Sequence, residues 1–278
     1  MADPKNGDLS VTALYTSATW AWAGLSGAEL LASPESRRVF DSTNGALALA
    51  RPFQKEPRSL QHALVHRHAM LDHLLRASGA RQVVELAAGL SRRGVAFSAD
   101  PSTRYTEVDL EHVLGHKRRL LERTPEGRAV LERPNLRLVA RDVVQSELDD
   151  LVTPGEPLFV LAEGLLVYLQ PEEQRALWRK VRGLLDRAGG GGFAFDLVPS
   201  SEEPEPGAAG KALGWMMKRF TGGKTFERDA RSRGDIAAEL GDAGFSGVEM
   251  IEPAAVAAAW SLPFADVPTR QLVFAGRR

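Results

Sequence analysis

The sequence contains no cysteine among its 278 residues. This absence excludes disulfide bonds, thiol nucleophiles and thiolate metal sites. Long apolar runs are also missing: the longest, such as 158–162 and 254–260, fall far short of the roughly 20 residues that a membrane-spanning helix needs. The first residues carry no apolar segment of the kind found in secretory signals. We therefore expect a cytoplasmic protein that does not enter a membrane.

The chain has little net charge. Its 35 basic and 36 acidic residues give a formal charge of -1, so no overall field attracts nucleic acid or an anionic membrane. A hydrophobic content of 44% over 278 residues is enough for a substantial core in a single domain. These values favour a small-molecule ligand over a polyanionic partner.

From about residue 81 the sequence alternates between short β-rich runs and helical runs. This order predicts an α/β fold built on a doubly wound sheet. We predict strands near residues 82–87, 104–109, 136–140, 157–162, 192–198, 245–251 and 270–276, and helices near 91–97, 111–124, 171–187 and 234–242. The glycine run 189–192 precedes a strand and not a helix, so it indicates a flexible connection and not a phosphate loop.

Two regions lie outside this alternation. Residues 1–80 are predicted to be helical, and 199–210 reads as a mobile loop before an amphipathic segment at 211–220. Because ligands of doubly wound sheets bind beyond the carboxyl ends of the strands, we expect both regions to cover that edge and to shape a substrate pocket.

The turn after the first predicted strand is poor in glycine. The strand 82–86 is followed by Ala87, Ala88 and Gly89, and Asp109 ends the next strand 20 residues after that glycine. This spacing is typical of a carboxylate that binds a nucleotide ribose, but dinucleotide sites use three glycines to approach a diphosphate. The sequence therefore predicts an adenosine cofactor without phosphates.

Arg67 lies in the middle of the apolar face of a helix predicted from about residue 58 to residue 77. A buried guanidinium needs a carboxylate partner. That partner is either a ligand or an acid of the protein such as Glu85; the remaining alternative is a side chain that extends to the surface. The spacing alone does not choose between these interpretations.

Three histidines, His62, His66 and His73, share the opposite face of the same predicted helix. The pair at i and i+4 suits a metal ion in principle. No third ligand is matched to it, however, so we expect an ordinary exposed helix face.

Acids also follow the third and fourth predicted strands, at Asp142 and Glu163. Each acid alone fits a helix cap. Together with Asp109 they predict a ligand site at one sheet edge, where an adenosine needs acceptors for its ribose and its adenine amino group and an ammonium needs an anion.

Four ordered motifs carry a family resemblance. They are RHAMLD at 67–72, QVVELAAGLSRR at 82–93, EVDL at 107–110 and AEGLLVYL at 162–169. The chain resembles S-adenosylmethionine-dependent methyltransferases of the leucine carboxyl methyltransferase superfamily, in the style of the bacterial polyketide O-methyltransferase branch. The resemblance implies a class I, Rossmann-like, seven-stranded sheet in a single domain. It divides the chain into a helical cap (1–80), a cofactor-binding core (81–198), a substrate-cover insertion (199–230) and the end of the core (231–278).

The resemblance also implies site roles. Arg67 binds the methionyl carboxylate, Asp109 with Leu110 binds the ribose, Asp142 with Val143 binds the adenine, and Glu163 lies beside the methionyl amino group and the reacting centre. The strand and turn contribute Glu85, Ala87 and Gly89 as cofactor contacts. The family usually has Gly-x-Gly followed by Leu-Asp-Thr-Arg, so Ala87 and Ser91 depart from its pattern. We expect these departures to weaken cofactor binding or to be compensated by another group.

The expected reaction is methyl transfer from S-adenosylmethionine to a carboxyl or hydroxyl oxygen of a small, polyketide-like metabolite. Such a displacement requires positioning and no metal, and a base only for an acceptor that is not already ionised. We expect Glu163 and Tyr168 to be catalytic. For the aromatic residues Tyr15, Trp20, Trp22, Trp215 and Phe220, core packing is the simpler interpretation. We expect a monomer or a homodimer.

Three alternatives stay open. The first is a methyltransferase that acts on a protein C-terminal carboxyl group. The second is a nicotinamide-dependent oxidoreductase in which Arg92 and Arg93 bind a phosphate, although the missing glycines and the motif at 162–169 argue against it. The third is a non-catalytic relative that keeps the fold for binding.

Overall fold

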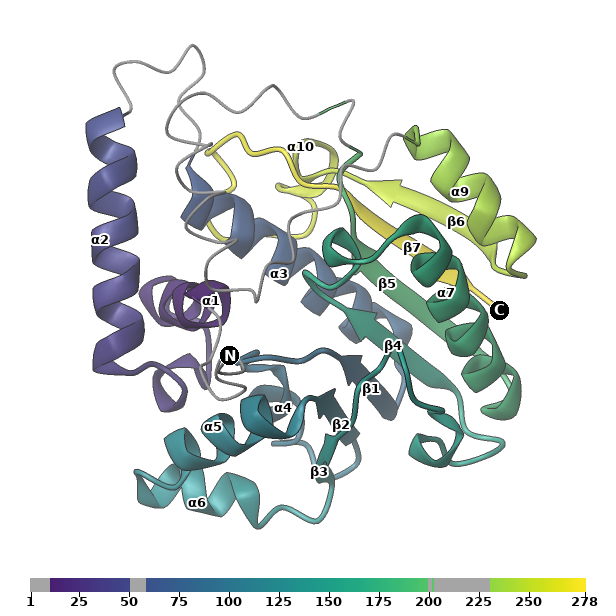
Figure 1. The fold of residues 1–278 in the computed structure, drawn as a ribbon, viewed down its shortest axis with the longest axis horizontal. Helices are drawn as coiled ribbons and strands as arrows, with labels where there is room; N and C mark the ends of the chain where they lie inside the picture. Colours follow the sequence, from purple (N-terminus) through teal and green to yellow (C-terminus); the bar gives the residue numbers. More distant parts are fainter. Residues whose placement is uncertain (1–10, 51–58, 200–201, 203–230) are drawn as a thin grey trace, which may run out of the picture.

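A computed structural model describes residues 11–50, 59–199, 202 and 231–278 (Figure 1). Most of the predicted loop 199–210, the predicted segment 211–220 with Trp215 and Phe220, and most of the insertion 199–230 lie outside these residues.

The described residues form a seven-stranded sheet in the order β3-β2-β1-β4-β5-β7-β6. Strands β1 to β5 are parallel to one another, whereas β7 runs antiparallel between β5 and β6. The strands are β1 (Gln82–Leu86), β2 (Arg104–Asp109), β3 (Leu136–Ala140), β4 (Leu158–Ala162), β5 (Gly191–Asp196), β6 (Ser246–Ile251) and β7 (Val273–Arg277). All seven predicted strands are present, so the α/β prediction is confirmed.

Helices surround this sheet (Figure 1). They are α1 (Val11–Trp22), α2 (Pro34–Ala50), α3 (Leu60–Ser78), α4 (Arg93–Phe97), α5 (Glu111–Leu121), α6 (Pro125–Leu131), α7 (Pro171–Arg187), α9 (Arg233–Asp242) and α10 (Pro253–Val256). The predicted helices are confirmed, with ends that differ by a few residues. Helices α6 and α10 were not predicted, because seven and four residues are too few to show a helical apolar period.

The core lies on both faces of the sheet. Strands β1 and β4 are buried along their whole length, and their side chains alternate between two apolar clusters. Val84 and Val160 join α7 and α9 in one cluster, whereas Val83 and Leu161 join α3 in the other. The fold therefore fixes the strand ends between two packed layers.

The N-terminal helices confirm the helical prediction for the described part of residues 1–80. Helix α1 packs between α2 and α3, and Tyr15 and Trp20 are buried there, as expected for core packing. The Tyr15 hydroxyl donates to the side-chain oxygen of Asn44 at 2.9 Å, and burial raises the pKa of Tyr15 to about 12. Trp22, by contrast, is 42% exposed and stacks on Phe264.

The expectation of an exposed histidine face on α3 is wrong for His66. This residue is buried; its Nε2 lies 2.9 Å from the carbonyl oxygen of Pro263 and its Nδ1 lies 2.6 Å from the Thr269 hydroxyl. The segment before β7 covers this side of α3, and a local pattern cannot reveal a partner 200 positions away. Among the described residues, no group of three or more histidine or acidic side chains is arranged to hold a metal ion. None of the helices in the described ranges offers an apolar stretch that would span a bilayer.

Candidate cofactor site

The parallel strands β1, β2, β4 and β5 end at the same edge of the sheet. The turn 87–89 follows β1, Asp109 ends β2, Glu163 follows β4 and Asp196 ends β5. Parallel pairing therefore brings these groups together, although they are spread over more than 100 residues of sequence.

The turn after β1 is bound to Asp109. The Gly89 amide donates to Asp109 Oδ2 at 2.6 Å, and the Leu110 amide donates to Oδ1 at 2.7 Å. A carboxylate has about four acceptor positions, so each Asp109 oxygen keeps capacity for a further donor. Burial raises the pKa of Asp109, and the two backbone hydrogen bonds act in the opposite direction. The side chain of Leu110 is 42% exposed beside this carboxylate.

Two residues of this turn adopt left-handed backbone conformations. Ala87 has φ 52° and Gly89 has φ 53°. A Cβ atom added to Gly89 would meet no heavy atom within 4 Å, so the backbone is open at this position. Alanine is strained in this region whereas glycine is not.

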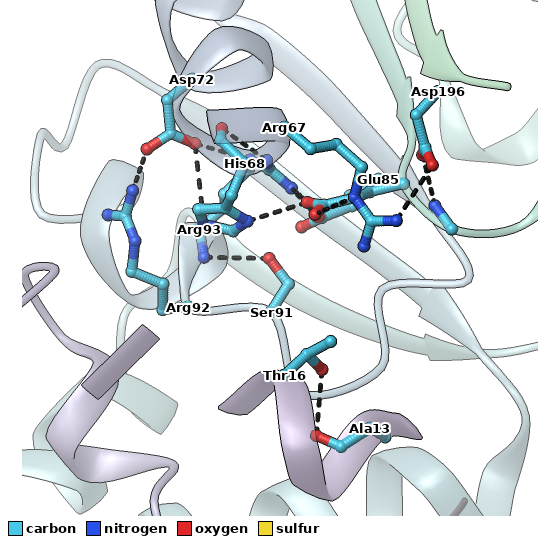
Figure 2. A network of polar contacts seen from close by, with 12 residues as sticks. Ala13, Thr16, Arg67, His68, Asp72, Glu85, Ser91, Arg92, Arg93 and Asp196 are labelled. Carbon is cyan, nitrogen blue, oxygen red and sulfur yellow. Dashed lines mark hydrogen bonds and ion pairs between the residues drawn. The ribbon is translucent and has the colours of Figure 1, made fainter. Parts of the chain in front are cut away.

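Arg67 extends from α3 toward the ends of β4 and β5 (Figure 2). Its Nε donates to Glu163 Oε1 at 2.9 Å and its Nη1 donates to Asp196 Oδ2 at 3.0 Å. Within the described part of the chain, Nη2 has no hydrogen-bond partner. The predicted pairing with an acid is confirmed, but the partners are Glu163 and Asp196 and not Glu85.

Glu163 receives three charged or polar groups. Besides Arg67 at Oε1, its Oε2 lies 2.8 Å from His68 Nδ1 and 2.6 Å from Arg93 Nη1. Burial opposes ionisation, but the charge of Arg93 and the contacts with His68 and Arg67 hold the pKa of Glu163 well below its usual range. Glu163 is therefore an anion at neutral pH.

Arg93 connects this carboxylate to a buried network (Figure 2). The guanidinium is fully buried; its Nε donates to Asp72 Oδ1 at 2.7 Å and its Nη1 donates to Glu85 Oε1 at 2.8 Å. The second Glu85 oxygen accepts from the Tyr105 hydroxyl at 2.8 Å. Glu85 is buried, and each of its oxygens accepts from a protein group, so the expected contact between Glu85 and the cofactor stays a prediction.

Arg92 and Arg93 are both buried against Asp72. Neither guanidinium is available to a cofactor phosphate, since moving it away would remove an ion-pair partner from the buried Asp72. The oxidoreductase alternative thereby loses the phosphate ligands that it required.

Asp142 and Val143 follow β3 at the same edge. Asp142 is exposed, and its Oδ1 accepts from the amides of Val144 at 2.9 Å and Gln145 at 3.2 Å. These two hydrogen bonds resemble those of a helix cap, which was the alternative interpretation of this acid. Val143 is buried in the core. The register of Asp109 with Ala140 places both residues near the end of β2.

Tyr168 lies in a short 3-10 helix (Leu166–Tyr168) after β4. Burial raises the pKa of its phenol, while a hydrogen bond with Thr12 of α1 and the charge of Arg67 lower it. Tyr168 is therefore a neutral group close to Arg67.

Sequence reasoning missed Asp196, His68 and Arg93 as members of this site. The fifth strand was predicted to run to residue 198, so Asp196 was not recognised as a strand end. Arg93 occupies the last position of the motif at 82–93 and was considered only as a phosphate ligand. Ser91, the departure beside it, accepts from Lys117 Nζ through its carbonyl oxygen at 2.6 Å.

The strand order and the acids at the strand ends define a class I methyltransferase fold. The chain belongs to the leucine carboxyl methyltransferase family, whose model matches residues 26–182. Two relatives described as S-adenosyl-L-methionine-dependent methyltransferases are similar to it. The protein from Parafrankia sp. is 31% identical over 191 residues, with 64% of this chain and 56% of the relative covered. The protein from Frankia alni is 31% identical over 182 residues, with 57% and 63% covered. The chain thus spans about three fifths of the length of these two relatives.

Solved structures agree on the fold. A methyltransferase from Thermobifida fusca superposes with a TM-score of 0.58 at 17% identity, and covers 98% of this chain and 95% of its own. The structure of PigF with S-adenosylhomocysteine has a TM-score of 0.52 at 16% identity, with 86% and 69% covered. Together with the family match, these comparisons confirm S-adenosylmethionine as the cofactor of the class.

Proposed function

We propose that this chain is an O-methyltransferase that transfers a methyl group from S-adenosylmethionine to a carboxyl or hydroxyl oxygen of a small, polyketide-like metabolite. The observation that carries the proposal is the convergence of Arg67, Glu163 and Asp109 at one sheet edge, beside an open turn at Gly89. We further propose that residues 1–80 and 199–230 form the substrate cover of a single domain that acts as a monomer or a homodimer.

The side chains at this edge match the chemical groups of the cofactor. Arg67 retains an Nη2 group for the methionyl carboxylate, and Glu163 is an anion suited to the methionyl ammonium. Asp109 retains acceptor capacity for the ribose hydroxyls. Leu110 is the candidate to lie beside the ribose with Asp109. Asp142 and Val143 are the candidates to surround the adenine, and Ala87 and Gly89 are the candidates to form the backbone beside the cofactor.

The cofactor, when bound, supplies a methyl group that its sulfonium already activates for in-line displacement. The protein then contributes mainly orientation and the exclusion of water. Glu163 is a poor proton acceptor because its pKa is held low, and Tyr168 keeps its proton because burial raises its pKa. We therefore assign Glu163 to cofactor binding and Tyr168 to donating a hydrogen bond toward an acceptor. A carboxylic acid acceptor, with a pKa near ~4, needs no base at neutral pH.

Two measurements test the proposal. Isothermal titration with S-adenosylmethionine should give saturable heat. If no heat is measured at millimolar S-adenosylmethionine, this cofactor is ruled out. Incubation with methyl-labelled S-adenosylmethionine and a panel of aromatic carboxylic acids and phenols should move label into an organic extract. Label in a protein fraction would instead favour the protein carboxyl methyltransferase, and binding without turnover would favour the non-catalytic relative.

A further inference from the structure

We propose that His68 is a positioning residue for the amino-acid end of the cofactor, because it holds Glu163 from the protein interior. This inference rests on the proposed function. His68 lies on α3 (Figure 2) and is fully buried. Its Nδ1 lies 2.8 Å from Glu163 Oε2.

The shared proton belongs to His68. Burial is the largest influence on the ring and, with the charge of Arg93, lowers the pKa of His68 to about 3, whereas Glu163 is ionised. A neutral imidazole facing a carboxylate must carry its hydrogen on Nδ1 and donate it. The other nitrogen, Nε2, then holds a lone pair. It is buried without a hydrogen-bond partner among the described residues, and the Asp72 Oδ1 atom lies 3.9 Å away.

Packing alone does not account for a histidine here. The ring stacks on Trp20 of α1 with centroids 4.1 Å apart and an interplanar angle of 25°. Phenylalanine would keep this stack and would avoid burying an unpartnered nitrogen, which lowers stability. What histidine adds is the hydrogen bond to Glu163.

That hydrogen bond is one of three contacts that fix the orientation of the carboxylate. Arg67 holds Oε1, while His68 and Arg93 hold Oε2. A carboxylate held at both oxygens meets an ammonium without first losing rotamer freedom, so binding is stronger. Because the same ring contacts Trp20, the orientation of Glu163 also depends on the docking of α1.

The test uses two variants and two ligands. His68→Phe keeps the stack and removes the donor, whereas His68→Asn keeps a donor close to the Nδ1 position and removes the stack. S-adenosylhomocysteine carries the amino-acid end, and 5′-methylthioadenosine lacks it. We expect His68→Phe to weaken S-adenosylhomocysteine binding by about tenfold to a hundredfold, to leave 5′-methylthioadenosine binding unchanged and to keep or raise the melting temperature. His68→Asn should recover most of the lost affinity.

His73 provides a matched control on the same helix. It stacks on Trp260 with ring centroids 4.1 Å apart and is half-buried, and it makes no hydrogen bond to Glu163 among the described residues. His73→Phe should change the affinity for neither ligand. The inference is overturned if His68→Phe weakens both ligands equally, weakens neither, or behaves like His73→Phe. If the unaltered chain binds neither ligand, the proposed function itself fails, and that outcome is distinct from a failure of His68 alone.

Discussion

Ala87 occupies a backbone conformation that glycine adopts without strain, so Ala87→Gly should stabilise the protein. Its φ of 52° lies in the left-handed region, which costs an alanine roughly 1–2 kcal/mol. Glycine removes this strain but gives the unfolded chain more freedom, by about 0.4–1 kcal/mol. The expected net gain of about 0.5–1 kcal/mol corresponds to a rise in melting temperature of about 1–4 °C.

The reverse change at Gly89 separates strain from cofactor binding. Gly89 and Gly79 have φ values of 53° and 63°, and a Cβ at either position would meet nothing within 4 Å. Gly89→Ala and Gly79→Ala should therefore each lower the free energy of unfolding by about 1 kcal/mol. Gly79 ends α3, before β1, whereas Gly89 follows β1 at the other end of the strand. Only Gly89→Ala should weaken S-adenosylhomocysteine binding, by at least about tenfold.

Thermal melts and calorimetric titrations of the three variants check this reasoning. Ala87→Gly should bind S-adenosylhomocysteine at least as tightly as the unaltered chain, because glycine permits a closer backbone approach. A lower melting temperature for Ala87→Gly, or an equal loss of affinity in Gly79→Ala and Gly89→Ala, would refute the proposed role of the turn.

Three further predictions concern the charged groups of the site. Arg67→Lys keeps the charge but loses the guanidinium fork. The affinity for S-adenosylhomocysteine should therefore fall by about tenfold or more, whereas the affinity for 5′-methylthioadenosine should not change. Equal losses for the two ligands would contradict a contact between Arg67 and the cofactor carboxylate. Asp109→Asn should lower the affinity for both ligands in calorimetric titration, because both carry the ribose. A loss of affinity for only one of the two ligands would exclude ribose binding by Asp109. The folded-state pKa of Glu163 lies well below 4.5, so its stabilisation is present above that pH and is lost as the pH falls. In denaturant titrations, Glu163→Gln should thus be less stable than the unaltered chain at pH 7 and should lose less stability on acidification; parallel pH profiles would count against the ion pairs.

The strands were predictable because buried parallel strands leave continuous apolar runs between turn residues. The run 158–162 shows this most clearly, since it is confirmed as β4 and is buried throughout. The ends of the last strand were predicted less accurately: β7 begins at Val273, three residues after its predicted start.

The site was predictable where a group is marked by its own local pattern. Arg67 interrupts an apolar helix face, and Asp109 and Glu163 follow strands. The partners of Arg67 were not predictable in this way. Asp196 reaches Arg67 because β5 lies beside β4. The sequence of either strand alone does not show which strand pairs with it in the sheet.

The burial of His66 and the contacts of His68 could not be predicted for the same reason. Both residues lie on α3, and their surroundings come from the segment before β7, from α1 and from the end of β4. A helical period gives the direction of a side chain, but not what the rest of the chain places there.

A crystal structure with S-adenosylhomocysteine tests the central claim most directly. The predicted result is a single ligand at the ends of β1, β2 and β4, with its carboxylate at Arg67, its amino group at Glu163 and its ribose at Asp109. A ligand bound away from these three side chains, or an edge that stays closed by the protein's own groups at saturating ligand, would contradict the account.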